Sequence, residues 1–263
     1  MPGYREGNME DNRRLDKSEI PVCRILGVDI AAVDMKWLME YTERHIKELS
    51  GDYMCVSNVH TTVTAYENED YRKIQNGGIM AIPDGGPLAS LGRNRGFSKM
   101  QRVAGPSYLE KVLEISADKK YRHFFYGSTE ETLEKLRAEL LKRYPGIEIS
   151  GMISPPFRNL TADEDREMVE RINASHSDFV WVGLGAPKQE CWMAEHQGRI
   201  EGFMVGVGAG FDYLAGNIKR APEWMQKHNL EWFYRLVQDP KRLLKRYFYT
   251  NTKFIWHAWI RGR

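Results

Sequence analysis

The chain has 263 residues, of which 42% are hydrophobic and 28% charged, and its formal net charge is +2. This composition is typical of a soluble globular protein with a sizeable core. The three cysteines, Cys23, Cys55 and Cys191, are scattered, which disfavours a disulfide framework or a zinc site and indicates a reducing compartment. The polar N-terminus does not predict a signal peptide, and no apolar run approaches the roughly 20 residues that span a bilayer.

Hydrophobic periodicity alternates between strand and helix along most of the chain. The polar segment over residues 1–20 is predicted to be disordered. Beyond it the pattern predicts helices over residues 34–49, around 60–75, and over 106–119, 128–144, 161–175 and 187–200. Strands are predicted between them, over residues 53–57, 78–82, 121–127, 146–151, 178–185 and 202–208. Such alternation is typical of βαβ units. We therefore predict an α/β fold, a Rossmann-like three-layer α/β/α sandwich with a mainly parallel sheet, as a catalytic domain over residues 21–221.

Two of the predicted helices begin with capping signals. Ser128, followed three residues later by Glu131, predicts a capping box. Thr161 is interpreted as an N-cap, so that the acidic run 163–165 fills the first helical turn, where carboxylates favour the helix dipole. This run resembles the Asp-x-Asp motif of metal-dependent sugar-nucleotide enzymes, but the capping interpretation argues against a metal site there.

Three predicted strands end in glycine just before a helix begins, at Gly127, Gly185 and Gly208. In open α/β sheets the ligand lies beyond the carboxyl ends of the strands, and backbone N–H groups at helix starts bind phosphate. Each glycine is equally well explained by the closing of a turn, but three together favour a phosphate-bearing ligand. None fits the Gly-x-Gly-x-x-Gly pattern of a dinucleotide site at the first βα turn.

Asp84 follows the apolar strand over 78–82, between Pro83 and Gly85. Aspartate between proline and glycine is ordinary turn chemistry. At the end of a central strand, however, a partly desolvated carboxylate is suited to act as a general base. Asn58 ends the strand over 53–57, where its amide either binds a sugar hydroxyl or caps the next helix.

Two more polar residues stand at strand ends. Lys188 lies in the first turn of a helix predicted to have Pro187 at N1. A cation there opposes the helix dipole, so Lys188 is easier to understand beside a bound anion. Asp212 is a further strand-end carboxylate, although it is as often a local cap.

The chain beyond Pro222, which we call the C-terminal appendage (residues 222–263), has a different character. Residues 219–263 hold 11 lysines and arginines against 3 acids, a charge of +8, so the total of +2 leaves −6 for the preceding residues. An apolar stripe of helical period, interrupted by Pro240, runs through Phe233, Leu236, Val237, Leu243, Leu244, Tyr247 and Phe248. A basic amphipathic segment with four tryptophans is typical of a helix on an anionic membrane. The alternative is a helix docked on the body with a solvated basic face.

Six segments together point to a family: IPDGGPLA, RVAGPSYLEKVLE, FFYGSTEETLEKL, VGLGAPKQE, VGVGAGFDYLAGNIKRAP and LEWFYRLVQDPKRLLKRY. In this order they resemble the WecG/TagA/CpsF family of bacterial glycosyltransferases, family 26, over residues 28–254. The Pro-Lys-Gln-Glu block and the block from Arg-Ala-Pro to Leu-Glu-Trp-x-x-Arg-Leu carry most of this resemblance. The glycine turns alone would not.

The resemblance implies an enzyme that moves a sugar, often of the N-acetylmannosamine type, from a UDP-sugar to a polyprenyl-diphosphate-linked sugar with inversion. Such enzymes build wall teichoic acid, enterobacterial common antigen, capsule or exopolysaccharide. By the same resemblance Asp84 is the general base, Asn58 and Gln189 line the site, and the arginines that meet the diphosphate are Arg235, Arg242 and Arg246. We also expect substrate contacts from Gly127, Gly185, Lys188 and Asp212.

Two departures from the family pattern concern the site. Many members carry a threonine two residues before the asparagine, where this chain has Val56, with Ser57 adjacent. Asp84 is followed by Gly85-Gly86-Pro87, where many members have Gly-x-Gly. The first change removes a hydroxyl, and the second alters the turn that presents the carboxylate.

The sequence thus predicts an inverting hexosyltransferase that uses no metal and no cofactor and transfers an N-acetylmannosamine-type or glucose-type sugar. The expected partners are a UDP-sugar donor, a polyprenyl-diphosphate-linked acceptor and the cytoplasmic membrane surface, with a peripheral location on its inner face. A homo-oligomer is expected off the membrane, and no nucleic acid. A nicotinamide-dependent oxidoreductase is the main alternative, although its glycine fingerprint is missing. A nucleic-acid-binding module would leave the six motifs unexplained.

Overall fold

The computed structural model describes residues 15–262, apart from the side chains of Lys227 and Arg242. Of the segment predicted to be disordered, residues 1–14 lie outside the described residues. The rest of it contacts the body: a short 3-10 turn, η1 (Lys17–Glu19), precedes Ile20, whose side chain is buried. The ammonium of Lys17 donates to the backbone carbonyls of Asn76 and Gly78.

One eight-stranded sheet forms the centre of the described chain, in the order β1-β2-β4-β3-β8-β7-β5-β6. The strands are β1 (Val22–Ile25), β2 (Val28–Ala31), β3 (Tyr53–Ser57), β4 (Met80–Pro83), β5 (Arg122–Gly127), β6 (Glu148–Ile153), β7 (Phe179–Gly183) and β8 (Phe203–Gly206). Every neighbouring pair is parallel except β1 and β2. All six predicted strands are present, and the predicted mainly parallel sheet is confirmed.

The antiparallel pair β1 and β2 is absent from the sequence-based prediction. These strands are joined by Leu26 and Gly27, whose φ angles of 51° and 84° are both left-handed. That is the geometry of a type I′ hairpin, which usually carries asparagine or aspartate before the glycine. Leu26 is instead buried, so the core imposes a turn that local sequence does not signal.

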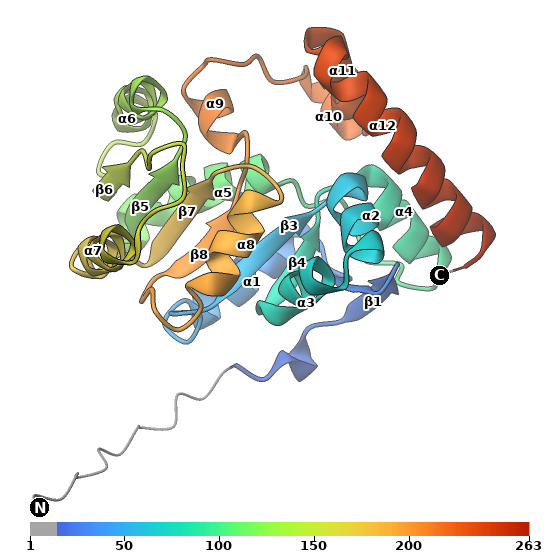
Figure 1. Cartoon of the computed structure of the whole chain (residues 1–263), viewed down its shortest axis with the longest axis horizontal. Coiled ribbons are helices and arrows are strands. Elements are labelled where there is room, and N and C mark those ends of the chain that lie inside the picture. Colours follow the sequence, from blue (N-terminus) through green and yellow to red (C-terminus); the bar gives the residue numbers. More distant parts are fainter. Residues whose placement is uncertain (1–14, 263) are drawn as a thin grey trace, which may run out of the picture.

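Helices cover both faces of the sheet (Figure 1). They are α1 (Met35–His45), α2 (Val59–Glu67), α3 (Glu69–Gly77), α4 (Gly86–Asn94), α5 (Gly105–Lys119), α6 (Glu130–Arg143), α7 (Ala162–Asn173), α8 (Lys188–Glu195), α9 (Gly210–Leu214), α10 (Glu223–Lys227), α11 (Glu231–Gln238) and α12 (Pro240–Phe254), followed by a π-helical turn, η2 (Ile255–Ile260). One apolar cluster joins the sheet to α1, α5, α6 and α9, and the other joins it to α2, α3, α4, α7 and α8. Alternate side chains of β5 divide between the clusters, Phe125 in the first and Phe124 in the second. The three-layer α/β/α fold is therefore confirmed.

Local chemistry moves several helix boundaries. The predicted capping box at Ser128 is wrong: Ser128 has a left-handed φ of 62°, and Thr129 is the N-cap, accepting from the N–H of Thr132. The predicted helix around 60–75 is two helices, because Asn68 ends α2 and caps α3. Pro187 lies one residue before α8 rather than inside it.

The sheet has a topological switch point between β3 and β8. These two strands are parallel neighbours, but β3 leads into α2 and β8 leads toward α9, which pack on opposite faces. Ligands in open α/β sheets bind in the crevice that such a divergence creates at the carboxyl ends of the strands. Asn58 and Gly208 follow these two strands directly or after one residue, so both lie at this edge.

The appendage is helical, as predicted, and Pro240 divides it into α11 and α12. Figure 1 shows α12 running along one side of the molecule, beside α2. Leu243 and Phe254 are buried at 1% exposure each, whereas Val237, Leu244 and Phe248 are 60% exposed or more. The predicted apolar stripe is therefore split, because Leu243 is buried while Val237, Leu244 and Phe248 face solvent, and Phe254 beyond the stripe packs in the apolar cluster that contains α2.

Candidate functional site

The carboxylate of Asp84 lies at the end of β4, beside the end of β3. The backbone N–H of Asp84 donates to the carbonyl of Ser57 at 2.8 Å, which extends the pairing of the two strands by one step. Asp84 and Asn58 are therefore brought together at one edge of the sheet. Gly85 is the N-cap of α4, a helix that the sequence-based prediction missed and whose first turn contains Gly86 and Pro87.

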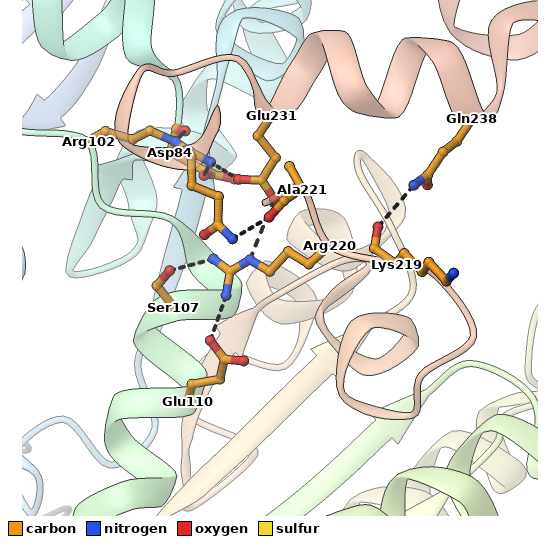
Figure 2. A network of polar contacts seen from close by, with 10 residues as sticks. Asp84, Arg102, Ser107, Glu110, Lys219, Arg220, Ala221, Glu231 and Gln238 are labelled. Carbon is orange, nitrogen blue, oxygen red and sulfur yellow. Dashed lines mark hydrogen bonds and ion pairs between the residues drawn. The ribbon is translucent and has the colours of Figure 1, made fainter. Parts of the chain in front are cut away.

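Asp84 belongs to a group of charged side chains that we call the ionic cluster: Asp84, Arg102, Glu110, Arg220 and Glu231 (Figure 2). Nη2 of Arg102 lies 3.5 Å from Oδ1 of Asp84 and 2.5 Å from Oε2 of Glu231. Nε of Arg220 lies 3.7 Å from Oε1 of Glu231. The cluster joins the loop before α5, the chain after α9 and the first turn of α11.

The pKa of Asp84 is raised to about 6, mainly because the carboxyl is buried. The positive charge of Arg102 opposes this effect and lowers the pKa. Glu231 raises this pKa further, and Arg235 and Arg220 oppose it. A carboxyl with a pKa near the operating pH is ionised at neutral pH and still accepts a proton readily. Asp84 therefore has the location and the basicity that a general base needs.

Asn58 acts as an N-cap in this structure. Its Oδ1 accepts from the N–H groups of His60 and Thr61, and the Thr61 hydroxyl accepts from the Asn58 N–H. Of the two sequence-based alternatives, capping is thus observed, while contact with a sugar stays a prediction. Ser57 does not replace the family threonine, because its buried hydroxyl donates to Oε1 of Gln75.

Gln189 ties together the ends of β7 and β8. Its Oε1 accepts from the N–H groups of Gly185 and Gly208, at 3.2 and 3.0 Å. Its Nε2 donates to the buried carboxylate of Glu190 at 2.8 Å. The two glycine N–H groups that the sequence assigns to phosphate are therefore donated to Gln189, which is itself only 4% exposed.

A chain of buried polar groups continues from Glu190 to β3. Tyr71 donates to Oε2 of Glu190 at 3.1 Å and accepts from Gln75, which in turn accepts from Ser57. We call this chain, from Ser57 through Gln75, Tyr71 and Glu190 to Gln189, the Gln189 brace. Burial raises the pKa of Glu190, while the hydrogen bonds from Gln189 and Tyr71 lower it. The brace holds three strand ends in fixed relative positions.

The remaining strand-end residues have unequal roles. A Cβ on Gly127 would lie 2.6 Å from the backbone of Gly183, so this glycine permits the close approach of β5 and β7. Gly185 has a φ of 76°, and a Cβ added there would meet no atom within 4 Å; Lys188 is exposed beside it. Oδ1 of Asp212 accepts from Asn217, which is the local role. Substrate contacts at these positions stay predictions.

The predicted arginines of the appendage fall on its body-facing side where they are described. The Arg235 guanidinium lies 5.9 Å from the ring centre of Tyr213, and its charge acts on Asp84. Burial lowers the pKa of His60 at the start of α2, and the charge of Arg246 lowers it further. Arg242 lies in α12, but its side chain is outside the described residues.

A cavity of about 520 Å³ opens beside the ionic cluster. Its described lining includes two guanidinium groups and no carboxylate, with polar side chains from three helices and the loops beside them: Arg93, Gln101, Arg102, Ser107, Gln226 and Asn229. Arg102 belongs both to this cavity and to the cluster around Asp84. The chemistry of the lining suits a hydroxyl-rich, negatively charged molecule.

The acidic run 163–165 fills the first turn of α7 as predicted, and the predicted N-cap Thr161 forms a reciprocal capping box with Glu164. Asp163 pairs with Arg166, and Asp165 pairs with His196 and Arg199. Across the described part of the chain, no group of three or more His, Cys, Asp or Glu side chains is arranged to hold a metal ion. Nor does any helix within residues 15–262 have the length and apolarity to cross a membrane.

Sequence reasoning missed Arg102, Arg220, Glu231 and the interior of the Gln189 brace. Arg102, Arg220 and Glu231 lie inside segments that carry the family resemblance: RVAGPSYLEKVLE, NIKRAP and LEWFYRL. Their presence in those segments was the signal that the sequence offered. The sequence did not indicate that they contact one another, because about 130 residues separate Arg102 from Glu231.

Comparison with known proteins identifies the family of the chain. The model of the Glycosyl transferase WecG/TagA/CpsF family matches residues 23–263. A Bacillus subtilis (strain 168) protein named N-acetylglucosaminyldiphosphoundecaprenol N-acetyl-beta-D-mannosaminyltransferase is 30% identical over 207 residues, which are 78% of this chain and 78% of the relative. A Staphylococcus aureus (strain MW2) protein of the same name is 28% identical over 231 residues, 87% of this chain and 89% of the relative. The chain therefore belongs to the WecG/TagA/CpsF family of glycosyltransferases.

Proposed function

We propose that this enzyme transfers a sugar of the N-acetylmannosamine or glucose type from a UDP-sugar to a polyprenyl-diphosphate-linked saccharide, with inversion and without a metal ion. The observation that carries the proposal is the Asp84 carboxylate, held at the end of β4 beside the switch point of the sheet, among arginines of the body and the appendage. The names of the relatives, which describe N-acetylmannosaminyl transfer to a lipid-diphosphate-linked sugar, support this class of substrates.

In the proposed reaction the acceptor hydroxyl attacks the anomeric carbon of the donor. Asp84 takes the hydroxyl proton as the new C–O bond forms and the bond from the anomeric carbon to the UDP oxygen breaks. The leaving diphosphate gains negative charge, which needs nearby cations or N–H donors. Arg235 already lies within electrostatic reach of Asp84, and Arg242 and Arg246 follow it along the appendage.

The decisive experiment is a donor screen with a defined lipid-linked acceptor. Purified protein is incubated with UDP-ManNAc, UDP-ManNAcA, UDP-Glc or UDP-GlcNAc and a polyprenyl-diphosphate-sugar analogue, and the lipid product is detected by mass spectrometry. We expect one donor to give a lipid product one sugar larger. Failure of all four donors, or UDP release without a lipid product, would contradict the proposal.

A peripheral position on the inner face of the cytoplasmic membrane is part of this proposal. The exposed apolar side chains of the appendage, including Trp224, Trp256 and Phe248, support it, because they lie on a strongly basic segment. Off the membrane, the same surface favours association of copies of the chain. Flotation with anionic vesicles, comparing the full chain with one that lacks residues 222–263, tests membrane binding. Equal binding of both would contradict it.

A further inference from the structure

Glu231 is a buried carboxylate that the appendage brings to the body. It begins α11, is 7% exposed, and its two oxygens contact Arg102 and Arg220 at 2.5 and 3.7 Å. A buried carboxylate of this kind is strongly disfavoured unless cations accompany it. Glu231 is thus fixed between two guanidinium groups, within reach of the proposed base.

Arg102 is shared between Glu231 and Asp84, and the sharing is unequal. Its Nη2 lies 2.5 Å from Glu231 and 3.5 Å from Asp84 (Figure 2). Its Nε is used on the backbone carbonyl of Asp84 at 2.8 Å, which fixes the guanidinium beside the turn. Charge-assisted hydrogen bonds are strongest at the shorter distance. The nearer partner of this arginine is therefore Glu231 and not the carboxylate that would take the proton.

Arg220 is held differently. Its guanidinium donates to Glu110 and to Ser107 on α5, both at 2.6 Å, so it has firm partners besides Glu231. Loss of Glu231 would leave Arg220 anchored to α5. The same loss would leave Arg102 with its side-chain N–H groups directed toward Asp84.

We propose that Glu231 is a positioning residue that keeps the Arg102 guanidinium off Asp84, so that docking of the appendage leaves Asp84 free to accept the proton. The inference rests on the proposed function of Asp84 as the base. By this inference the appendage has a second role besides supplying cations. It supplies the Glu231 carboxylate, which pairs with the Arg102 guanidinium of the body. With the appendage undocked, Arg102 loses its nearer partner, closes on Asp84 and weakens it further as a base.

The charged and titratable groups around Asp84 determine in which direction its pKa changes when Glu231 is neutralised. Arg102 comes from the loop before α5, Arg220 from the chain after α9, Glu231 and Arg235 from α11, and Tyr213 from α9. Burial raises the pKa of Asp84, and Glu231 raises it further, whereas the three arginines lower it. Neutralising Glu231 removes one raising charge and strengthens the effect of Arg102. The pKa of Asp84 must then fall.

The test is the pH dependence of kcat/KM in the full-length Glu231→Gln enzyme, with UDP-sugar and lipid-linked acceptor. Because a close opposite charge lowers a carboxyl pKa by about 1–3 units, we expect the acidic limb to move down by at least about one pH unit. A weaker base should also lower the plateau kcat by roughly tenfold. Glu131→Gln is the matched control: it makes the same substitution at an exposed acid of α6 that pairs with Lys135 and lies outside the ionic cluster, so its limb should match wild type.

A conservative variant keeps the test decisive if Glu231→Gln does not fold. Glu231→Asp keeps the charge but withdraws it by one methylene, so its limb should shift in the same direction by a smaller amount. A limb unchanged from wild type in both folded variants, or in Glu231→Asp alone where only it folds, would overturn the inference. Wild-type turnover by Asp84→Asn would instead overturn the proposed function, so the two failures are distinguishable.

Discussion

Two polar networks lie at the same edge of the sheet, and they differ in what they connect. The Gln189 brace lies wholly within the body and joins the ends of β3, β7 and β8 through neutral groups and one buried carboxylate. The ionic cluster crosses from the body to the appendage and consists of alternating charges. Folding of the body alone therefore shapes one side of the site. The reactive side depends on where the appendage docks.

The largest expected effect is the loss of catalytic rate when the Asp84 carboxylate is replaced. General-base catalysis contributes about 10²–10⁴ in rate, so Asp84→Asn should lower kcat by that order. Transfer assays measure this, with Asp163→Asn, a surface acid paired with Arg166, as the control.

The same variant should be more stable than wild type, not less. Burial raises the pKa of Asp84 to about 6, above its unfolded value of 3.8. The charged carboxylate therefore costs stability, fully above pH 6 and not at all below pH 3.8. A shift of roughly two units corresponds to at most about 3 kcal/mol gained at pH 8. Urea unfolding at pH 8 and at pH 4 measures it, and a loss of stability at pH 8 would show that the carboxylate is structural.

Neighbouring leucines of α12 test which face of the appendage docks. Leu243 is 1% exposed and Leu244 is 60% exposed. Leu243→Ala should lower the free energy of unfolding by about 2–5 kcal/mol, because it opens a cavity on the buried side of α12. Leu244→Ala should change it by no more than about 0.5 kcal/mol but weaken vesicle binding. Equal effects of the two substitutions on unfolding would refute this docked arrangement.

Removal of the Glu190 carboxylate tests the brace. Glu190→Ala leaves the Nε2 of Gln189 and the hydroxyl of Tyr71 without their acceptor, at a cost of about 1–3 kcal/mol in unfolding free energy. Since the strand ends lose their alignment, we also expect a higher KM for the UDP-sugar. The cost in stability should persist in a chain that lacks residues 222–263. Its disappearance there would mean that the brace, too, depends on the appendage.

The smallest effect is the pH dependence of the wild-type enzyme. Since Asp84 must be ionised to accept a proton, kcat/KM should fall about tenfold per pH unit below pH 6. Initial rates between pH 4.5 and 8 measure this limb. A flat profile over that range would place the titration of the base elsewhere.

Much of the fold could be predicted because it depends on local patterns. Short apolar runs and period-3.6 hydrophobicity located six of the eight strands and the long helices, and Thr161 was identified as an N-cap. The β1–β2 hairpin was missed because its turn has buried Leu26 where a polar residue is usual. Ser128 was misread because a capping signal one residue away, at Thr129, was the one used.

The sequence by itself determined the fold class, the family motifs and the candidate base, since each is a property of neighbouring residues or of short ordered segments. Only the tertiary structure decided which side chains meet. It placed Arg102 between Asp84 and Glu231, and it turned Gln189 toward two glycine N–H groups. The physical reason is that such contacts join parts of the chain far apart in sequence. Their strength depends on distance and burial, which no local pattern encodes.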